Sequence, residues 1–507
     1  MKPRGKNSRT GVSLNFSRAG FWLYRFGLAL SFLALLPVNS AGAQARLSDG
    51  TEAAESRGTN CSQKSSLAAQ APRLAANQPL ESADPYQTAY NYLVTFYPRW
   101  FTWQQGSGGP CNRLVGPNRV TPLYHVVVAI NVDTLYASTF LGLKDEPVIL
   151  TIPKTQDIYS VLHLDQYGAL VPNGLSGTNT AGVYAIVGPD WAGTLPEGVT
   201  RVNVPYNYSE LLFRADKFSP QGKDMKVEAE KFRRNLRAQG LLEYLKNPKE
   251  GATDILPPRD FAFPFKTFAD GLISTDAIEF LRQTMDAVAS PTTQPLTQDQ
   301  QTLSDTFDAL FSDRSKHPQL AAGAKAGHEA IIDNYLSHTI SGSTWTFFDD
   351  IANWDLSTFQ GYLNRASITE FCQYCNNHDA AAYFHTFLDA SGEPLDGSTH
   401  RYVLTFAKGQ QPTAKRFWSL TAYTPEAIEL VQNKADKYAV ASYTPGLVTA
   451  KDGSVTIVIS TTPPADKKQQ PNWLPIPSGP FNIMLRVYGP EGSVLDGTYV
   501  PPPVTEQ

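Results

Sequence analysis

Two stretches of the chain hold short apolar runs that are separated by turn residues. The runs are rich in β-branched and aromatic residues, with Pro, Gly, Asn and Asp between them, as is typical of short strands joined by tight turns. In the first stretch they cover residues 124–130, 131–136, 147–152, 159–164, 182–187 and 200–204. In the second they cover residues 400–406, 416–423, 438–440, 454–460 and 481–488. Strands and helices do not alternate within either stretch, so the pattern favours β domains over a parallel α/β sheet.

Helical spacing of apolar residues occurs before and between these stretches. Residues 85–103 show it, and Asp84 followed by Pro85 predicts an N-cap and a first helical position. In residues 274–289, Ile278, Leu281 and Met285 share one face. Further helices are expected at 210–215, 225–245, 301–310 and 327–336. The two β stretches are therefore separated by a mainly helical segment.

These patterns predict a mainly β protein with helical insertions, in which two β-sandwich (jelly-roll-like) domains are joined by a helical bridge. The 507 residues are too many for one ordinary hydrophobic core. Residues 44 to about 80 are rich in Ala, Ser, Gln and Asn and lack a hydrophobic period, so they predict disorder. We expect a signal peptide at 1–43, a disordered lead-in at 44–83, an N-terminal β domain at 84–208, a mainly helical bridge at 209–340 and a C-terminal β-sandwich domain at 341–507.

The first 43 residues have the pattern of an export signal. They hold six basic residues and no acidic residue, followed by an apolar run at 26–36 and the small-x-small sequence Ala41-Gly42-Ala43. The apolar run is too short to span a bilayer comfortably. The protein is therefore expected to be secreted or periplasmic, with an uncleaved anchor as the alternative. No later stretch approaches the length of a transmembrane segment, so none is expected after cleavage.

The charge of the mature chain bears on its partners. The whole chain has 43 basic and 47 acidic residues, and removal of the six basic residues of the signal leaves a formal charge near −10. Such a surface repels nucleic acid, and nucleic acid is not expected as a partner. The expected partner is a small molecule or a glycan, and the residues do not determine the oligomeric state.

The chain has four cysteines. An even number in an exported chain favours disulfides, and we expect the pairs Cys61–Cys111 and Cys372–Cys375 because each lies within one region. The alternative for Cys372-Gln373-Tyr374-Cys375 is a redox dithiol, although no thioredoxin-like βαβ pattern surrounds it.

The strong catalytic signatures are missing from the sequence. It contains no nucleophile elbow, phosphate-binding Walker loop, zincin helix or dinucleotide fingerprint. No two histidines have the i, i+4 spacing of a helical metal site, so no metal ligands are predicted and no cofactor is identified. His163 and Asp165 lie two apart on an expected strand and share a face, as a ligand pair or as a hydrogen-bonded core pair.

The sharpest local feature is the segment from Asn131 to Tyr136. On a strand, Asn131 and Asp133 would project to one side and Thr134 and Tyr136 to the other. Buried polar residues in so apolar a run need hydrogen-bond partners. They therefore form either a ligand or catalytic face, or a corner where Asn131 and Asp133 bond nearby backbone.

Arginines and aromatic residues supply two further candidates. Arg214, Arg365 and Arg486 lie in apolar or aromatic surroundings, where a guanidinium needs a carboxylate or several carbonyls. Asp133 is a candidate partner, and an inter-domain Arg–Asp lock is the alternative to anion binding. Aromatic faces with amides suit stacking on sugar rings or flat apolar ligands, the alternative being an aromatic sandwich core. The candidate ligand-binding residues are Trp418, Tyr423, Asn472, Trp473 and Arg486.

The order of several motifs resembles a pair of families. The first set is Asn131-Val132-Asp133-Thr134-Leu135-Tyr136, Glu146-Pro147-Val148, Gly188-Pro189-Asp190-Trp191 and Leu195-Pro196. It resembles the domain of unknown function 1254, in which an Asn-Arg-Asp motif usually stands where this chain has Val132 in place of the arginine. The second set is Leu395-Asp396-Gly397, Phe417-Trp418-Ser419-Leu420-Thr421-Ala422-Tyr423, Asn433, Asp452-Gly453-Ser454, Asn472-Trp473-Leu474-Pro475 and Arg486-Val487-Tyr488. It is similar to the domain of unknown function 1214.

The resemblance covers residues 85 to 505 and is weakest over 220–340. It implies an exported protein with two β-sandwich domains and helical insertions, and it implies little about chemistry. Two functions are open. The first is binding of a carbohydrate or small apolar ligand between or on the sandwiches. The alternative is an enzyme acting on an extracellular polysaccharide, a lyase or a hydrolase. Its candidate catalytic residues are Asn131, Asp133, Tyr136, His163 and Arg214.

Overall fold

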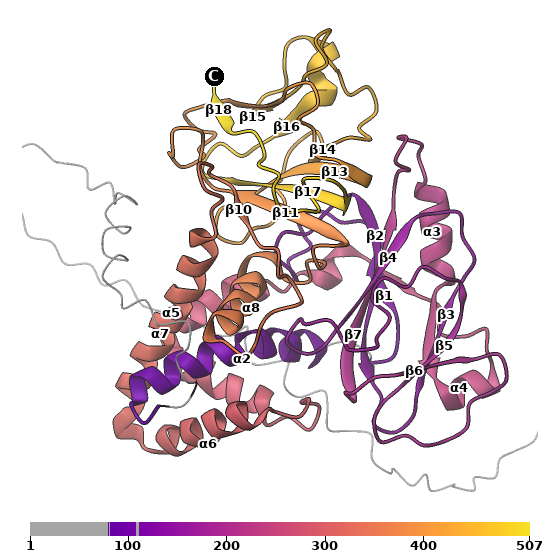
Figure 1. Ribbon diagram of the computed structural model, residues 1–507, viewed down its shortest axis with the longest axis vertical. Coiled ribbons are helices and arrows are strands. Elements are labelled where there is room, and N and C mark those ends of the chain that lie inside the picture. Colours follow the sequence, from indigo (N-terminus) through magenta and orange to yellow (C-terminus); the bar gives the residue numbers. More distant parts are fainter. Residues whose placement is uncertain (1–79, 81, 108–110) are drawn as a thin grey trace, which may run out of the picture. The chain divides into compact units, whose positions relative to one another are not determined.

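The computed structural model describes residues 80, 82–107 and 111–507 (Figure 1). The expected signal peptide at 1–43 and nearly all of the expected lead-in at 44–83 lie outside these residues. The described residues form four sheets in two β regions with a central helical segment, with 30% helix and 25% strand. The expectation of a mainly β protein was therefore wrong, because the helices between the β regions are longer than the strands beside them.

The N-terminal β region consists of two sheets. One has the order β4–β7–β2–β1–β9, formed by β4 (Tyr159–Leu164), β7 (Tyr208–Asp216), β2 (Thr134–Gly142), β1 (Val115–Pro117) and β9 (Asp254–Leu256). The other has the order β6–β5–β3–β8, formed by β6 (Thr200–Asn203), β5 (Gly182–Val187), β3 (Val148–Ile152) and β8 (Arg237–Gly240). The two sheets share one core, to which Phe213 and Ala137 of the first sheet and Leu150 and Ile186 of the second contribute. Helices α3 (Lys226–Asn235) and α4 (Leu241–Lys246) accompany these sheets.

Residues 210–215 form the middle of β7, not the helix that their spacing predicts. This strand pairs antiparallel with β2 on one side and with β4 on the other. A short apolar run is compatible with the period of a helix and with that of a strand, and here pairing with β2 and β4 determines that it forms a strand. Conversely, residues 124–130 lie in an irregular segment, and β2 begins only at Thr134.

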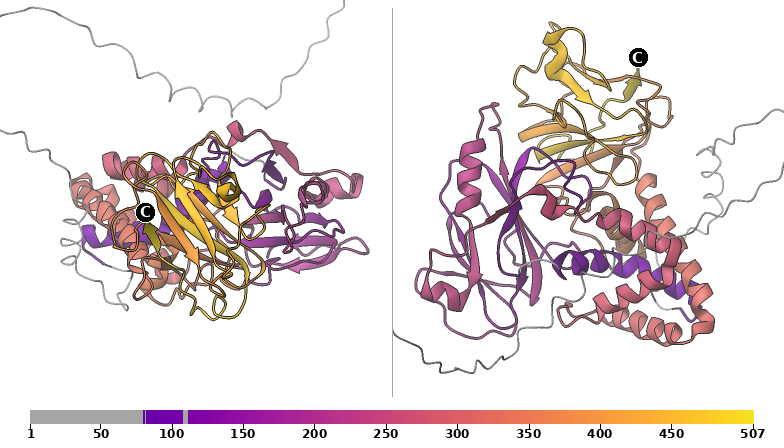
Figure 2. Two further views of the ribbon diagram at one scale, coloured as in Figure 1. Left: turned by 90° about the horizontal axis from the view of Figure 1, so that it is seen from above. Right: turned by 180° about the vertical axis from the view of Figure 1, so that it is seen from behind.

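The central helical segment is built around α2 (Pro85–Ser107), which Figures 1 and 2 show among helices that come much later in the chain. These are α5 (Phe265–Val288), α6 (Gln298–Ser312), α7 (His317–Ser337) and α8 (Phe359–Cys372). Asp84 caps α2 as expected, because its Oδ2 accepts the N–H of Gln87 at 2.9 Å. The helices share a core that includes Trp100, Phe280 and Phe307. Short 3-10 helices cover Pro258–Phe261, Arg314–Lys316 and Lys467–Asn472.

The C-terminal β region also consists of two sheets with a common core. The first has the order β10–β11–β17–β13–β14, formed by β10 (Thr346–Phe347), β11 (Ala381–Thr386), β17 (Asn482–Pro490), β13 (Ala414–Tyr423) and β14 (Ala439–Ala441). The second has the order β16–β15–β12–β18, formed by β16 (Trp473–Pro475), β15 (Val455–Ser460), β12 (Tyr402–Phe406) and β18 (Val504–Glu506). Along β17, Leu485 and Val487 face the common core, while Met484 and Tyr488 belong to a cluster on the opposite face.

The elements cross the expected domain boundaries. β8, β9 and all of β7 except its first residue, Tyr208, lie within the expected bridge at 209–340 but pair in the N-terminal sheets. Within the described ranges, no helix has the length and apolar character required to cross a membrane.

Candidate functional site

The β2–β7 face of the N-terminal region packs against the β11–β13–β17 face of the C-terminal region through buried polar and aromatic side chains. We call this group the inter-sheet cluster. It consists of Asn131, Asp133, Tyr136, Arg214, Tyr383, Ser419, Tyr423, Tyr443, Arg486 and Tyr488. Six of these residues were singled out by the sequence, and the structure brings them together although they are up to 355 positions apart in the chain.

Asn131 and Asp133 lie in a turn that precedes β2. The Asn131 Oδ1 accepts the backbone N–H groups of Asp133 at 3.0 Å and Thr134 at 3.2 Å, so the side chain closes the turn. The Asn131 amide also donates to the Tyr488 hydroxyl at 2.7 Å. The Asp133 carboxylate accepts from the hydroxyl of Ser419 at 2.8 Å and from that of Tyr443. Asn131 thus bonds nearby backbone as the corner alternative expects, whereas the Asp133 carboxylate bonds two side-chain hydroxyls of the C-terminal region, so both side chains link the β regions.

Arg214 and Arg486 enter the cluster from β7 and β17. Arg214 donates to the Asn376 Oδ1 at 3.0 Å and to the Tyr374 carbonyl at 2.5 Å, and Arg486 donates to the Ala129 carbonyl. Each guanidinium also lies over a tyrosine ring, Arg214 at 5.6 Å from Tyr136 and Arg486 at 5.3 Å from Tyr423. Among the residues that the structure describes, neither arginine forms an ion pair with a carboxylate.

Tyr136 shows that the two guanidiniums belong to one electrostatic environment. Burial raises the pKa of its hydroxyl, while Arg214 and Arg486 both lower it. Burial also raises the pKa of Tyr488 well above its usual value. Both phenols are therefore neutral at physiological pH, and each can donate a hydrogen bond.

His163 does not join these residues. It lies on β4 with its ring in the core between the two N-terminal sheets, on the face opposite to Leu162 and Tyr136. Its Nε2 is 2.9 Å from the Ser209 hydroxyl, and its Nδ1 accepts the N–H of Leu175. Burial lowers its pKa to about 3, so the ring is neutral. The His163 ring therefore bonds Ser209 and Leu175, and Asp165 is not among its hydrogen-bond partners.

Asp165 closes the turn after β4. Its carboxylate accepts the N–H groups of Tyr167 and Ala169 at 2.9 Å each, and the Gln294 amide at 3.2 Å.

The three candidate ligand-binding aromatic residues, Trp418, Tyr423 and Trp473, are buried. Trp418 lies in the core between the two C-terminal sheets, and the buried Trp473 donates its Nε1–H to the Ser460 carbonyl at 2.9 Å. Asn472 bonds backbone groups of Val448 and Thr456. Tyr423 donates to the Ile130 carbonyl at 2.8 Å, inside the inter-sheet cluster. These residues do not form one surface, because alternate positions of β13 face two different cores.

One group of side chains in the described ranges has the composition of a metal site. Asp270, His328 and Glu370, from α5, α7 and α8, have ligand atoms within 4.8 Å of one another. The Lys266 ammonium already occupies this position, at 2.6 Å from the Asp270 Oδ2 and 2.5 Å from the Glu370 Oε1. We call these four residues the helical ion network.

The ionisation states balance the charge of the helical ion network. Burial raises the pKa of Glu370, but Lys266 and His328 lower this pKa by more than burial raises it, so that it lies at about 2. Burial lowers the pKa of His328, and its contacts with Asp270 and Glu370 raise it to about 9. Two cations therefore face two carboxylates. A metal ion would have to displace the ammonium, so the geometry fits an internal ion network that joins three helices.

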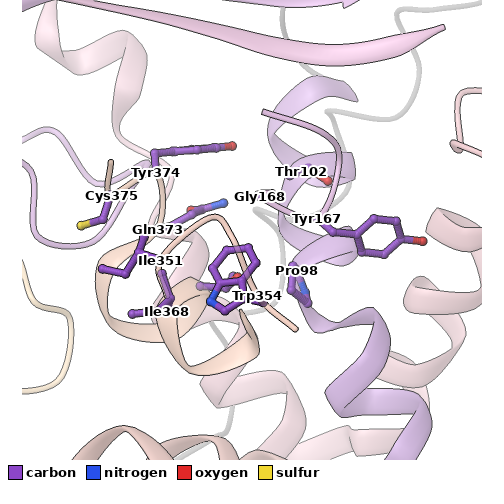
Figure 3. Close-up of a pocket in the computed structure, with 11 residues that line it drawn as sticks. Pro98, Thr102, Tyr167, Gly168, Ile351, Trp354, Ile368, Gln373, Tyr374 and Cys375 are labelled. Atoms are coloured by element: carbon purple, nitrogen blue, oxygen red, sulfur yellow. The ribbon is translucent and has the colours of Figure 1, made fainter. Parts of the chain in front are cut away.

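A hollow lies beside the end of α8, and its lining was not identified from the sequence. The space between its walls that no atom fills amounts to about 320 Å³ with open solvent included, and no lining residue carries a charge. Figure 3 shows the Trp354 indole and the Gln373 amide between Pro98 on one side and Ile351 and Ile368 on the other. The remaining lining residues are Thr102, Tyr167, Gly168, Thr369, Tyr374 and Cys375. They come from four separate segments and share no sequence period, so apart from the cysteine spacing no pattern marked them.

Tyr374 connects the hollow to the inter-sheet cluster. Its side chain lines the hollow, and its carbonyl accepts from Arg214. Its φ of 62° is in the left-handed region, which is uncommon for a residue with a side chain. The neighbouring Cys372–Cys375 disulfide confirms one expected pair. The second expected pair, Cys61–Cys111, stays a prediction, because Cys61 lies outside the described residues and Cys111 forms no disulfide with a described residue.

Fold and site together define a mixed α/β protein in which two β regions meet at a buried polar cluster. The chain matches the model of DUF1254, a protein of unknown function, over residues 111–240, and that of DUF1214, likewise of unknown function, over residues 380–492. It therefore carries both domains of this paired family of unknown function.

The solved structures that are similar to the chain include the following two. The VPA0106 protein from Vibrio parahaemolyticus matches with 21% sequence identity and a TM-score of 0.51, over 83% of this chain and 100% of that one. An uncharacterised protein from Burkholderia cenocepacia matches with 11% identity and a TM-score of 0.40, over 82% of this chain and 87% of that one. The first likeness shows a common fold. No curated protein matches the chain.

Proposed function

We propose that this protein binds a small, uncharged, ring-bearing molecule, a sugar or an apolar ring, in the hollow beside Trp354. The observation that carries the proposal is the lining, which combines aromatic and aliphatic faces with an amide and no charged side chain. Such walls suit a flat neutral ring that stacks on the indole and forms few, directed hydrogen bonds.

The Trp354 indole supplies one directed hydrogen bond. Its Nε1–H is buried and has no acceptor among the described residues. A ligand with a hydroxyl, ether or carbonyl oxygen would provide that acceptor and relieve the cost of a buried unpaired donor. Gly168 brings the backbone close to this ring, since a Cβ at that position would lie 3.7 Å from the indole.

The titratable groups of the hollow favour binding over catalysis. Tyr167 and Tyr374 are the titratable lining residues outside the disulfide. Burial raises the pKa of Tyr167 to about 12 and that of Tyr374 well above its usual value. Neither phenol can accept a proton at neutral pH, so the lining offers no general base for lyase or hydrolase chemistry.

We further propose that the protein acts outside the cytoplasm and that each β region is a β-sandwich. The Cys372–Cys375 disulfide and the basic, then apolar, N-terminal pattern support export. The common core of each sheet pair supports the sandwich architecture.

Saturation-transfer NMR on the purified protein tests the binding proposal. The panel holds neutral mono- and oligosaccharides and neutral aromatic fragments, with uronates as charged counterparts. We expect saturation transfer to neutral members, a change in tryptophan fluorescence on titration, and weak or no signal from uronates. Trp354→Ala is expected to weaken binding at least tenfold, because it removes the stacking face and the unpaired donor.

Trp191→Ala is the matched control, because Trp191 is partly exposed, lies under Arg201 and does not line the hollow. Binding by this variant should equal that of the unchanged protein. Equal binding by the Trp354→Ala protein, or no neutral ligand in the panel, would overturn the proposal. Release of unsaturated products from a uronate polymer would favour the enzymatic alternative.

A further inference from the structure

The inter-sheet cluster and the helical ion network differ in their charge balance. In the helical network, two cations face two carboxylates. In the inter-sheet cluster, Arg214 and Arg486 are accompanied by a single carboxylate, that of Asp133. Arg416 and Asp216, at the edge of the cluster, neutralise each other. An uncompensated buried charge is costly, so the excess positive charge between the sheets requires an explanation.

The neighbouring ionisable groups do not remove this excess. Burial raises the pKa of Glu210 to about 8, so it is mostly uncharged at neutral pH. Burial lowers the pKa of Lys217 to about 8, which leaves it mostly protonated, and its ammonium donates to the Val132 carbonyl at 2.6 Å. Glu210 therefore supplies no negative charge, and the Lys217 ammonium adds a further positive charge.

Hydrogen-bond donors are also in excess. Arg214 Nε and Arg486 Nη1 are buried, and neither has an acceptor in the described part of the chain. Arg486 is 1% exposed and Arg214 is 5% exposed, so bulk water does not satisfy these groups.

Two tyrosine hydroxyls add to the unused donors. The Tyr488 oxygen accepts from Asn131 at 2.7 Å, and the Tyr383 oxygen accepts from Asn376 at 2.7 Å. Each phenol keeps its own proton for donation, and the described residues present no acceptor to either. Tyr383 pairs with Arg486 across β11 and β17, and its ring centre lies 6.5 Å from that of Tyr488. Arg214 interacts electrostatically with both phenols, so these donors lie in the same region.

We propose that a small inorganic anion of the halide class binds in the inter-sheet cluster, held by Arg214 and Arg486 with the hydroxyls of Tyr383 and Tyr488. An anion accepts hydrogen bonds from all four groups and balances one guanidinium charge, whereas a water molecule would balance no charge. Bound there, it stabilises the contact between the two β regions. This site is separate from the Trp354 hollow and does not depend on the proposed ligand.

Thermal unfolding of the full protein tests the site first. At constant ionic strength and pH, replacing sodium gluconate with sodium chloride or bromide is expected to raise Tm by roughly 3 °C at anion concentrations well above Kd. Gluconate is too large to enter between packed sheets, so it supplies ionic strength without occupancy. Crystals grown in bromide should show an anomalous peak within contact distance of both guanidiniums.

Conservative variants separate site occupancy from folding. Tyr488→Phe and Tyr383→Phe each remove one hydroxyl and keep the ring, and each should reduce the chloride-dependent rise in Tm by at least half. Tyr402→Phe is the matched control, because this buried hydroxyl already bonds the backbone of Asp396 in the C-terminal region. It should leave the chloride dependence unchanged.

Three results would overturn the proposal. These are equal Tm values in gluconate and chloride, an ordered water without anomalous signal at the site, and a chloride dependence that both cluster variants retain in full. If a phenylalanine variant does not fold, the bromide experiment on the unchanged protein still decides the question.

Discussion

Arg416 on β13 forms a bidentate ion pair with Asp216, the last residue of β7. Nε lies 2.8 Å from Oδ2, and Nη2 contacts Oδ1. Asp216 is 1% exposed, and the guanidinium also lies 5.1 Å from the centre of the Tyr488 ring. This bidentate pair joins the N-terminal and C-terminal β regions across 200 residues of sequence. A lock of the Arg–Asp kind was considered from the sequence, with Asp133 as the acid. The candidate arginines were Arg214, Arg365 and Arg486, and the pair that forms, Arg416 with Asp216, contains neither the expected acid nor an expected arginine.

Asp216→Asn tests this pair. The change leaves the Arg416 guanidinium buried without a counter-charge, so we expect a loss of about 3–5 kcal/mol in the free energy of unfolding, measured by urea denaturation. Asp254→Asn is the control, because its pair with Arg113 is exposed and should contribute less than about 1 kcal/mol. Similar losses from the two variants would show that Arg416 and Asp216 do not act as a buried pair.

Glu370→Gln tests the helical ion network. Glu370 is fully buried and accepts from Tyr97, while its second oxygen contacts Lys266. Removing its charge leaves Lys266 and His328 facing Asp270 alone, and we expect a loss of about 3–5 kcal/mol. In the double variant with Lys266→Met the loss should be smaller than the sum of the single losses, because the two residues interact directly. Additive losses would mean that the pair is not coupled.

Asp157→Asn tests a pH dependence. Burial and the nearby Asp216 raise the pKa of the Asp157 carboxyl to about 7, and neither of its oxygens has a hydrogen-bond partner among the described residues. Because the folded state holds this proton more tightly than the unfolded state, the contribution to stability is full below about pH 4 and is lost as the pH rises through 7.

Asparagine resembles the protonated acid and does not titrate. Asp157→Asn should therefore match the unchanged protein at pH 4 and exceed it at pH 8 by about 1–2 kcal/mol, after allowance for solvent screening. Unfolding curves across this range measure the difference. A difference that does not change with pH would contradict the raised pKa.

Two glycines test how closely α2 and α7 pack. A Cβ on Gly323 of α7 would lie 2.0 Å from the Tyr86 carbonyl oxygen of α2, whereas a Cβ on Gly271 of α5 would meet nothing within 4 Å. Gly271→Ala should stabilise the protein by about 0.5–1 kcal/mol through helix propensity. Gly323→Ala should destabilise it by about 1–3 kcal/mol, because the helices must separate. Equal effects in thermal unfolding would show that the helices are not in close contact at Gly323.

The helices of the central segment were largely predictable because they are long and periodic. The N-cap at Asp84 and the helix that follows it agree with the sequence pattern, and so do the predicted helices at 301–310 and 327–336. Residues 210–215 show where the pattern fails. Six residues of mixed character fit a helical turn as well as a strand, and pairing with β2 and β4 determines the strand.

The candidate site was predictable in part. Asn131, Asp133, Arg214 and Arg486 were recognisable because polar and charged groups in apolar runs must find buried partners. Their mutual bonding was not predictable, since it depends on how two sheets from distant parts of the chain meet. Apart from the Cys372–Cys375 spacing, the Trp354 hollow left no sequence signal, because its walls come from separate helices and loops.

The sequence by itself determined the succession of two strand-rich regions around a helical segment, the paired family and the Cys372–Cys375 disulfide. These features depend on local spacing and on ordered motifs. Only the tertiary structure decided which core each face of a strand packs against. His163 and Arg214 lie on neighbouring strands of one sheet, yet they face different cores. A period of two places alternate side chains on opposite faces, and only the packing of the second sheet determines what each face meets.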